Sequence, residues 1–115
     1  MKVAISSTDD NLDANVDRRF GRCAWFMFVD IESMQCEAVE NKNANAATGA
    51  GTACAQLVLG KEVEAIISGQ VGPNAYEVLK QGSVKIFIAT QEMCVREAIE
   101  KYKNNELKQM EMKVF

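Results

Sequence analysis

Residues 63–90 read VEAIISGQVGPNAYEVLKQGSVKIFIAT, a pattern of strand, helix and strand. Short apolar runs at Val63–Ser68 and Val84–Thr90 predict the two strands. The helix between them opens at Gly72-Pro73-Asn74, because proline suits the first helical turn, and it ends near Gly82. Strands joined by a helix are typical of parallel neighbours with a right-handed crossover. This segment therefore predicts an open α/β sheet.

The flanking residues extend this unit into a larger sheet. The other predicted elements, three strands followed by two helices, are Lys2–Ser7, Ala24–Ile31, Met34–Glu40, Ala50–Lys61 and Gln91–Asn104. The second and third of these strands form a hairpin, whereas the tail at 105–115 has no clear pattern. The order β-β-β-α-β-α-β-α predicts one domain, residues 1–115, with a mixed five-stranded sheet, helices on its faces and a ribonuclease-H-like topology.

The charge and hydropathy of the chain argue against several classes of protein. The 115 residues include 13 Lys and Arg against 16 Asp and Glu, a net charge of −3, which disfavours nucleic-acid binding. No run approaches the roughly 18 apolar residues of a membrane span. The N-terminal MKVAISSTDD turns acidic too early for a signal peptide. We therefore expect a cytoplasmic protein without membrane contact, whose four cysteines are reduced.

The chain contains no histidine. This excludes Ser-His-Asp and Cys-His catalysis, a histidine general base and histidine metal ligands. The first predicted strand, Lys2–Ser7, holds no acidic residue, which argues against a two-metal nuclease. Because no pair of catalytic groups can be assigned, we expect a protein that is not an enzyme.

Two glycine-bearing loops lead into predicted helices at the edge of the sheet where open α/β folds bind ligands. They are Thr48–Thr52 and Ser68–Asn74. Backbone N–H groups at a helix N-terminus favour anions, and glycine lets a ligand approach the backbone closely. The candidate binding residues are Thr48, Gly49, Gly51, Gly69, Gly72 and Asn74. The alternative is that both loops are ordinary turns and helix caps.

Three arginines lie close together in the segment Arg18-Arg19-Phe20-Gly21-Arg22. Guanidinium groups suit multidentate recognition of anions, so this segment is a candidate binding loop. The alternative is a solvated loop whose arginines pair with Asp13 and Asp17.

The four cysteines include no C-x-x-C pair, which excludes zinc-finger and thioredoxin spacings. Cys36 and Cys54 lie on predicted apolar faces and are interpreted as core residues. Cys94 is predicted in the first turn of a helix, where the helix dipole would stabilise a thiolate. Cys23 directly follows the arginines and is the best candidate for a soft-metal ligand or a reactive thiol.

Three segments together carry a family resemblance. Asn15–Phe26 is similar to V-S-x-x-F-G-R-A-x-x-F, Thr48–Gly51 to a glycine loop before a helix, and Ile67–Ala75 to G-x-(I/V)-G-P-x-A. In this order and spacing the chain, up to about Leu107, resembles the dinitrogenase iron–molybdenum cofactor biosynthesis family, with its NifX-like and NifB C-terminal-like domains.

The resemblance implies a ribonuclease-H-like fold without nuclease activity. It also implies transient binding, storage or carriage of an anionic iron–sulfur-type or iron–molybdenum-type cofactor or its precursor, with metal-cluster assembly proteins as partners. Phe20-Gly21-Arg22 and the two glycine loops would form the site. Many members have a histidine in the first glycine loop. This chain has Thr48 or Gly49 there, so Cys23, another thiol or outer-shell contacts would hold the cofactor. The alternative is a regulatory or protein-interaction module of the same fold.

Overall fold

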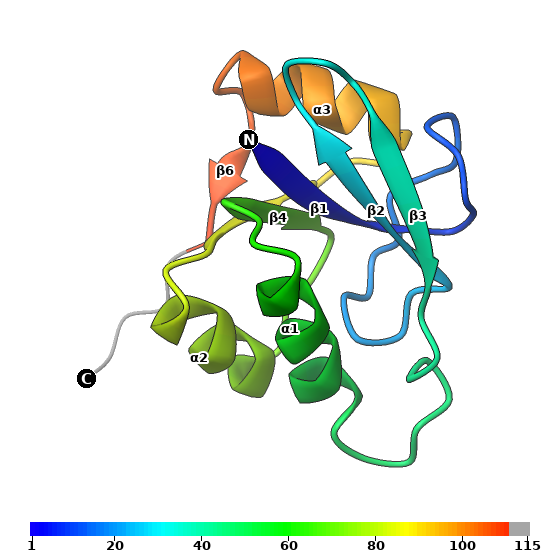
Figure 1. Cartoon of the computed structure of the whole chain (residues 1–115), viewed down its shortest axis with the longest axis vertical. Helices are drawn as coiled ribbons and strands as arrows, with labels where there is room; N and C mark the ends of the chain where they lie inside the picture. The colour runs from blue at the N-terminus through cyan, green and yellow to red at the C-terminus, as the bar shows by residue number, and fades with distance from the viewer. Residues whose placement is uncertain (111–115) are drawn as a thin grey trace.

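The computed structural model describes residues 1–110 of the chain. Its strands and helices, in chain order, are β1 (Lys2–Ser7), β2 (Trp25–Asp30), β3 (Cys36–Glu40), α1 (Ala50–Gly60), β4 (Ala65–Ser68), α2 (Pro73–Gln81), β5 (Lys85–Ile88), α3 (Val95–Lys103) and β6 (Lys108–Gln109). One sheet contains the strands in the order β3-β2-β1-β4-β5-β6 (Figure 1).

The centre of the sheet is parallel and its flanks are antiparallel. β4 pairs in parallel with both β1 and β5, whereas β2 runs antiparallel to β1 and to β3. The α/β class, the mixed open sheet and the hairpin formed by β2 and β3 are therefore as predicted. The carboxyl ends of β1, β4 and β5 share one edge of the sheet, which is where open α/β folds bind ligands.

The sheet has six strands rather than the predicted five. Lys108–Gln109 (β6) pairs antiparallel with β5, and Met110 N donates to the carbonyl oxygen of Ile86 at 2.7 Å. Two paired residues are too few to produce a periodic pattern, which is why the sequence of the tail does not reveal this strand. The rest of the predicted tail, residues 111–115, lies outside the described residues.

Two elements start later than predicted because neighbouring contacts take over their first residues. The strand predicted from Met34 begins at Cys36, since Met34 lies in a turn with a φ of 62°. The helix predicted from Gln91 begins at Val95, since Met93 instead accepts a backbone hydrogen bond from the β1–β2 loop. Cys94 consequently precedes α3 and is not in its first turn.

The prediction that Cys36 is a core residue is wrong, because Cys36 is exposed. It lies on β3, which forms one edge of the sheet and is largely exposed along its length. An alternating pattern identifies the face that a residue shares, but not whether a helix extends far enough to cover that face.

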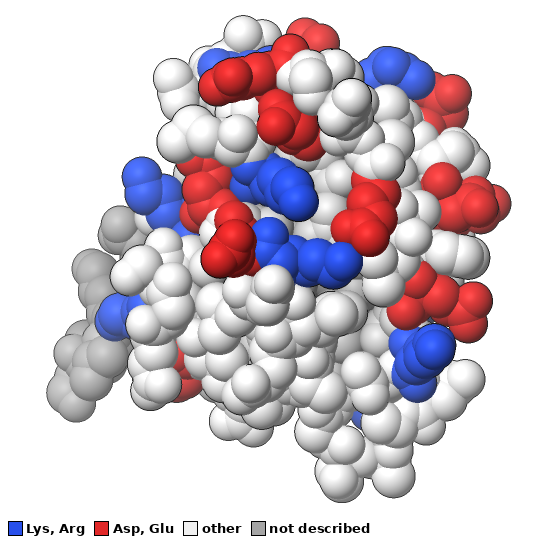
Figure 2. Space-filling view, in the orientation of Figure 1, with Lys and Arg blue, Asp and Glu red and all other residues white. Residues whose placement is uncertain are grey.

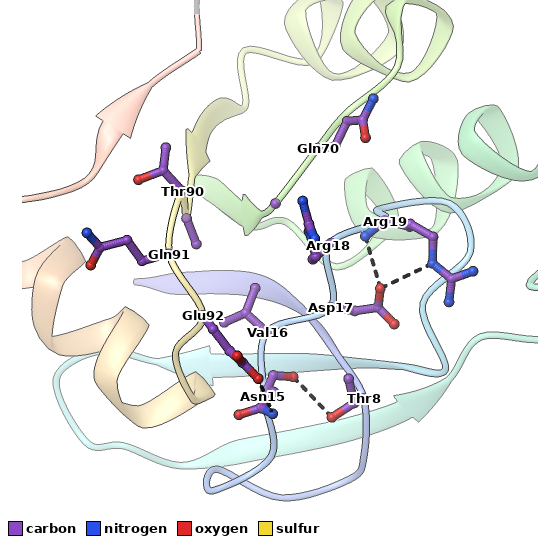
Figure 3. Close-up of a pocket in the computed structure, with 12 residues that line it drawn as sticks. Thr8, Asn15, Val16, Asp17, Arg18, Arg19, Gln70, Thr90, Gln91 and Glu92 are labelled. Carbon is purple, nitrogen blue, oxygen red and sulfur yellow. Dashed lines mark hydrogen bonds and ion pairs between the residues drawn. The ribbon is translucent and has the colours of Figure 1, made fainter.

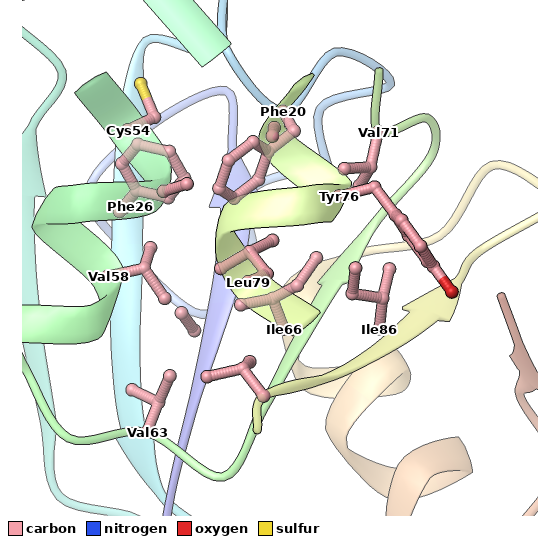
Figure 4. Close-up of a cluster of buried hydrophobic side chains, with 14 of the residues drawn as sticks. Phe20, Phe26, Cys54, Val58, Val63, Ile66, Val71, Tyr76, Leu79 and Ile86 are labelled. Atoms are coloured by element: carbon pink, nitrogen blue, oxygen red, sulfur yellow. The ribbon is translucent and has the colours of Figure 1, made fainter. Parts of the chain in front are cut away.

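Apolar side chains fill both faces of the sheet, because alternate residues of a strand point to opposite sides. α1 and α2 cover one face, whose buried side chains include Phe20, Phe26, Val58, Ile66 and Leu79 (Figure 4). α3 covers the other face, whose buried side chains include Val3, Ile5, Met27, Ile67 and Ile99. This two-sided burial explains the continuous apolar runs of β1 and β4. Within residues 1–110, no helix has the length and apolar character needed to cross a membrane.

Candidate functional site

A cleft of about 780 Å³ opens at the edge of the sheet where β1, β4 and β5 end. Thr8, Gly69 and Ala89, which directly follow these three strands, contribute to its lining. The other lining residues come from the loops that follow the same strands: Asn15, Val16, Asp17, Arg18, Arg19, Gln70, Thr90, Gln91 and Glu92 (Figure 3). Its volume is in the range of small-molecule sites.

A pair of buried serines fixes the loop that carries the arginines. Ser6 Oγ donates to the carbonyl oxygen of Asp17 at 2.8 Å and lies 2.8 Å from Ser68 Oγ. Ser6 and Ser68 are 1% and 0% exposed. Burying a hydroxyl costs free energy unless it is hydrogen-bonded. The two serines therefore favour the position of the β1–β2 loop in which the Asp17 carbonyl accepts the bond from Ser6. They hold the β1–β2 loop against the ends of β1 and β4.

The β1–β2 loop also reaches the start of α3. Val16 N donates to the carbonyl oxygen of Met93, and Val95 N donates to that of Ala14, both at 2.8 Å. The second bond satisfies one of the N–H groups that a helix start leaves unpaired. The protein's own backbone thus provides an acceptor at the N-terminus of α3. Backbone hydrogen bonds also connect the two sides of the cleft.

Arg18 and Arg19 both line the cleft, but their side chains have different partners. Arg19 Nε lies 3.5 Å from Asp17 Oδ1, and the same oxygen accepts a hydrogen bond from Arg19 N at 2.9 Å. Arg18 is exposed, and its guanidinium makes no hydrogen bond or ion pair with residues 1–110. Arg18 is therefore the arginine of this pair that is available to an anionic ligand.

Arg22 lies outside the cleft lining and stabilises a different loop. Its Nη1 donates to the carbonyl oxygens of Ala44, at 3.0 Å, and Ala46. Both acceptors belong to the irregular segment between β3 and α1. The guanidinium thus satisfies backbone groups of that segment, a structural role that the sequence did not predict.

Two glycines let the arginine segment lie against its neighbours. A Cβ on Gly69 would lie 2.6 Å from Arg18 Cα, and a Cβ on Gly21 would lie 2.9 Å from Cα and N of Gly51. Neither position has room for a side chain. The structure therefore brings the arginine segment into contact with both predicted glycine loops, although Phe20 within it is a buried core residue.

The starts of α1 and α2 lie side by side. A Cβ on Gly51 of α1 would be in contact with Ala75 Cβ of α2, at 3.5 Å. Neither helix has a side-chain hydrogen bond at its N-cap, so the N–H groups in the first turn of α1, and those that follow Pro73 in α2, have no capping side chain as acceptor. Four of the predicted binding residues, Thr48, Gly49, Gly72 and Asn74, are exposed at these two helix starts, and none of them lines the cleft. Of the predicted binding residues, the cleft is lined by Arg18, Arg19 and Gly69.

Cys23 lies beneath the arginine segment and is fully buried. Its thiol donates to the carbonyl oxygen of Phe20 at 3.3 Å, and burial raises its pKa to about 12. Asn41 Nδ2 donates to the carbonyl oxygens of Cys23 and Gly21, while Asn41 Oδ1 lies 3.3 Å from Cys54 Sγ. Cys54 is buried as predicted, and burial raises the pKa of its thiol as well. Both thiols are protonated groups of the core at neutral pH.

No cluster of three or more Cys, Asp or Glu side chains among residues 1–110 is arranged to hold a metal ion. The cleft lining offers two guanidinium groups, the carboxylates of Asp17 and Glu92, hydroxyl and amide groups and backbone. The guanidinium and neutral donor groups suit the outer atoms of an anion, and none of the lining side chains is a good ligand for a bare soft metal ion.

Comparison of the sequence with known protein families complements this geometry. The model of the dinitrogenase iron-molybdenum cofactor family matches residues 1–105. The chain belongs to this family. The uncharacterized protein MJ0580 of Methanocaldococcus jannaschii is 37% identical over 92 residues, which cover 77% of this chain and 75% of that relative. The resemblance based on the three sequence segments is thereby confirmed.

Two solved structures are similar to this member of the dinitrogenase iron-molybdenum cofactor family. The apo form of the orange protein (ORP) from Desulfovibrio gigas has a TM-score of 0.90 and 29% identity, over 95% of this chain and 92% of that one. The NMR structure of a putative NifB protein from Thermotoga has a TM-score of 0.82 and 37% identity, over 94% and 91% of the two chains.

Several residues that line the cleft in this dinitrogenase iron-molybdenum cofactor family member belong to no motif in the sequence analysis. They are Thr8, Thr90, Gln91 and Glu92. Each follows one of the three parallel strands, so topology identifies them and residue type does not. The sequence does mark Ser6 and Ser68 as unusual positions, since each places a hydroxyl at the end of a largely apolar strand.

Proposed function

We propose that this protein binds and carries an anionic iron–sulfur-type or iron–molybdenum-type cofactor or its precursor, without catalysing a reaction. The observation that carries the proposal is the unpaired guanidinium of Arg18 at the cleft, on a loop held by Ser6 and Ser68. Membership of the dinitrogenase iron-molybdenum cofactor family supports the chemical class of the ligand.

The ligand would be held from outside by charge and hydrogen bonds. Metal–sulfur clusters of this class are anionic, and a guanidinium, neutral donors and open helix N-termini all attract anions. The described lining of the cleft contains no thiol. We therefore propose that the cluster is held at the cleft without a thiolate ligand from the protein. The prediction that Cys23 is a metal ligand remains open to test, but it requires the arginine segment to move away from a buried thiol.

The partners would be the proteins that deliver and receive the cluster. On the face drawn in Figure 2, positive and negative side chains are mixed, and the described residues form no continuous basic area. This distribution supports protein partners over nucleic acid, which requires a concentration of positive charge. We also propose that residues 1–115 form one domain of ribonuclease-H-like topology, for which the strand order β3-β2-β1-β4-β5 is the support.

Anaerobic reconstitution with iron and sulfide tests the proposal. The protein is treated under reducing conditions, desalted, and analysed for iron, sulfide and visible absorption. We expect Arg18→Ala to retain several-fold less iron and sulfide than the unmodified chain. Arg96→Ala is the matched control, because Arg96 is exposed and pairs with Asp13 outside the cleft. Equal retention by Arg18→Ala and the unmodified chain would refute the assignment of the site.

A protein-interaction module of the same fold is the second candidate. The side-by-side starts of α1 and α2 favour it, because open backbone donors there also suit an acidic side chain of a partner. A colourless protein after reconstitution, together with a stable partner in a pull-down, would support this candidate over the carrier.

A further inference from the structure

The charged groups that line the cleft balance one another. Arg18 and Arg19 are positive, Asp17 and Glu92 are negative, and the other lining residues are neutral. Asp17 is engaged with Arg19, as its Oδ1 contacts both Nε and the backbone N of that residue. Among residues 1–110, an incoming ligand therefore meets one unpaired cation, Arg18, and one carboxylate without a cationic partner, Glu92.

Glu92 lines the cleft on a segment whose backbone is bonded to the β1–β2 loop. Asn15 Nδ2 donates to Glu92 Oε1 at 3.5 Å, and Asn15 also faces Cys94 in an antiparallel bridge. The next residue, Met93, accepts a backbone hydrogen bond from Val16. Figure 3 shows Glu92 on the side of the cleft formed by the β5–α3 segment, across from Arg18. The exposed Glu92 side chain thus belongs to the cleft wall and contacts Asn15 there.

We infer that Glu92 is a specificity residue that limits the charge of the anion the cleft accepts. Arg18 attracts an anion, while the carboxylate across the cleft repels it. Each charge on the ligand adds the same increment of repulsion, so a more highly charged anion suffers more. Glu92 therefore narrows the advantage that Arg18 gives to highly charged anions, and its removal should strengthen the binding of a dianion more than that of a monoanion. This inference rests on the proposed function, since it concerns the same cleft.

Two tetrahedral oxoanions of different charge test this role. Molybdate is a dianion and perrhenate a monoanion of similar shape, so a change in electrostatic repulsion affects them unequally. Binding of each is measured by calorimetry at low ionic strength, where exposed charges are least screened. Glu92→Gln removes the charge and nearly preserves the side-chain shape. Glu100→Gln is the control, because Glu100 is exposed on α3 outside the cleft lining.

We expect Glu92→Gln to strengthen molybdate binding about fourfold and perrhenate binding about twofold, since the logarithm of the gain scales with ligand charge. Glu100→Gln should change both by much less. Equal gains for the two anions would mean that the new amide only adds a hydrogen bond. That result would overturn the inference but not the proposed function. The same holds if Glu92→Gln gives no gain, or if Glu100→Gln has an equal effect. If neither anion binds any of the proteins, the inference is overturned, whereas the proposed function is decided separately by the iron and sulfide retained by Arg18→Ala.

Discussion

At the scale of single residues, the partners of a side chain determine its role more than its type does. Arg18, Arg19 and Arg22 lie within one short segment, yet Arg22 binds the carbonyl oxygens of Ala44 and Ala46 and Arg18 makes no such contact. The sequence indicates an arginine cluster suited to anions. It does not indicate which guanidinium is available, because the competing acceptors lie more than twenty residues away along the chain.

Cys23 yields a prediction about pH. Burial raises the pKa of its thiol from 9.0 to about 12, so in the alkaline range the folded protein keeps a proton that the unfolded chain loses. Stability supplied by this thiol is complete below pH 9.0 and is lost as the pH rises towards about 12. We expect the free energy of unfolding to fall more steeply from about pH 8 to about pH 10 in the unmodified chain than in Cys23→Ala.

Denaturant titrations at each pH provide the measurement. Cys36→Ala serves as the control, because Cys36 is exposed and its removal should leave the slope unchanged. Parallel pH profiles for the unmodified chain and Cys23→Ala would contradict the view that Cys23 is a protonated core group.

At the scale of elements, the sequence pattern predicts the helices and strands whose ends are set by residues nearby in the chain. The strand-helix-strand unit at 63–90 has apolar runs, a proline at a helix start and a glycine at its end, and the structure contains that unit. The start of α3 and the strand β6 depend on partners elsewhere in the chain, namely the β1–β2 loop and β5. The glycine loops were predicted from composition, but lining residues that follow β1 and β5, such as Thr8 and Glu92, were not, since these residues belong to no motif.

Gly69 provides the prediction at this scale. A methyl group there would overlap Arg18 Cα, so the arginine loop and the end of β4 must separate. We expect Gly69→Ala to lower the free energy of unfolding by about 2–3 kcal/mol, the typical cost of overpacking. Urea denaturation measures the change.

Gly60→Ala is the matched control for this substitution. Gly60 is at the end of α1, and a Cβ there would meet nothing within 4 Å. Its replacement should leave stability nearly unchanged or slightly higher. If Gly69→Ala proves as harmless as Gly60→Ala, the close contact between the arginine loop and β4 is not a feature of the folded protein.

At the scale of the whole molecule, the parallel centre of the sheet creates the site. Because β1, β4 and β5 point the same way, loops that are distant in the chain meet at one edge. Arg18, Gly69 and Glu92 come from three such loops. Two buried serines and the backbone bonds of the β1–β2 loop then hold the edge together. The fold thus supplies the cleft that we propose as an anion site, and its described lining contains neither a histidine nor a thiol.

The most direct test compares Arg18→Ala with Cys23→Ala after anaerobic reconstitution with iron and sulfide. Iron and sulfide are quantified in both variants and in the unmodified chain, and circular dichroism confirms that each is folded. If the cluster is held by charge at the cleft, Cys23→Ala retains nearly the full iron content and Arg18→Ala loses most of it. Full retention by Arg18→Ala together with loss by Cys23→Ala would contradict the account and assign the cluster to a thiolate.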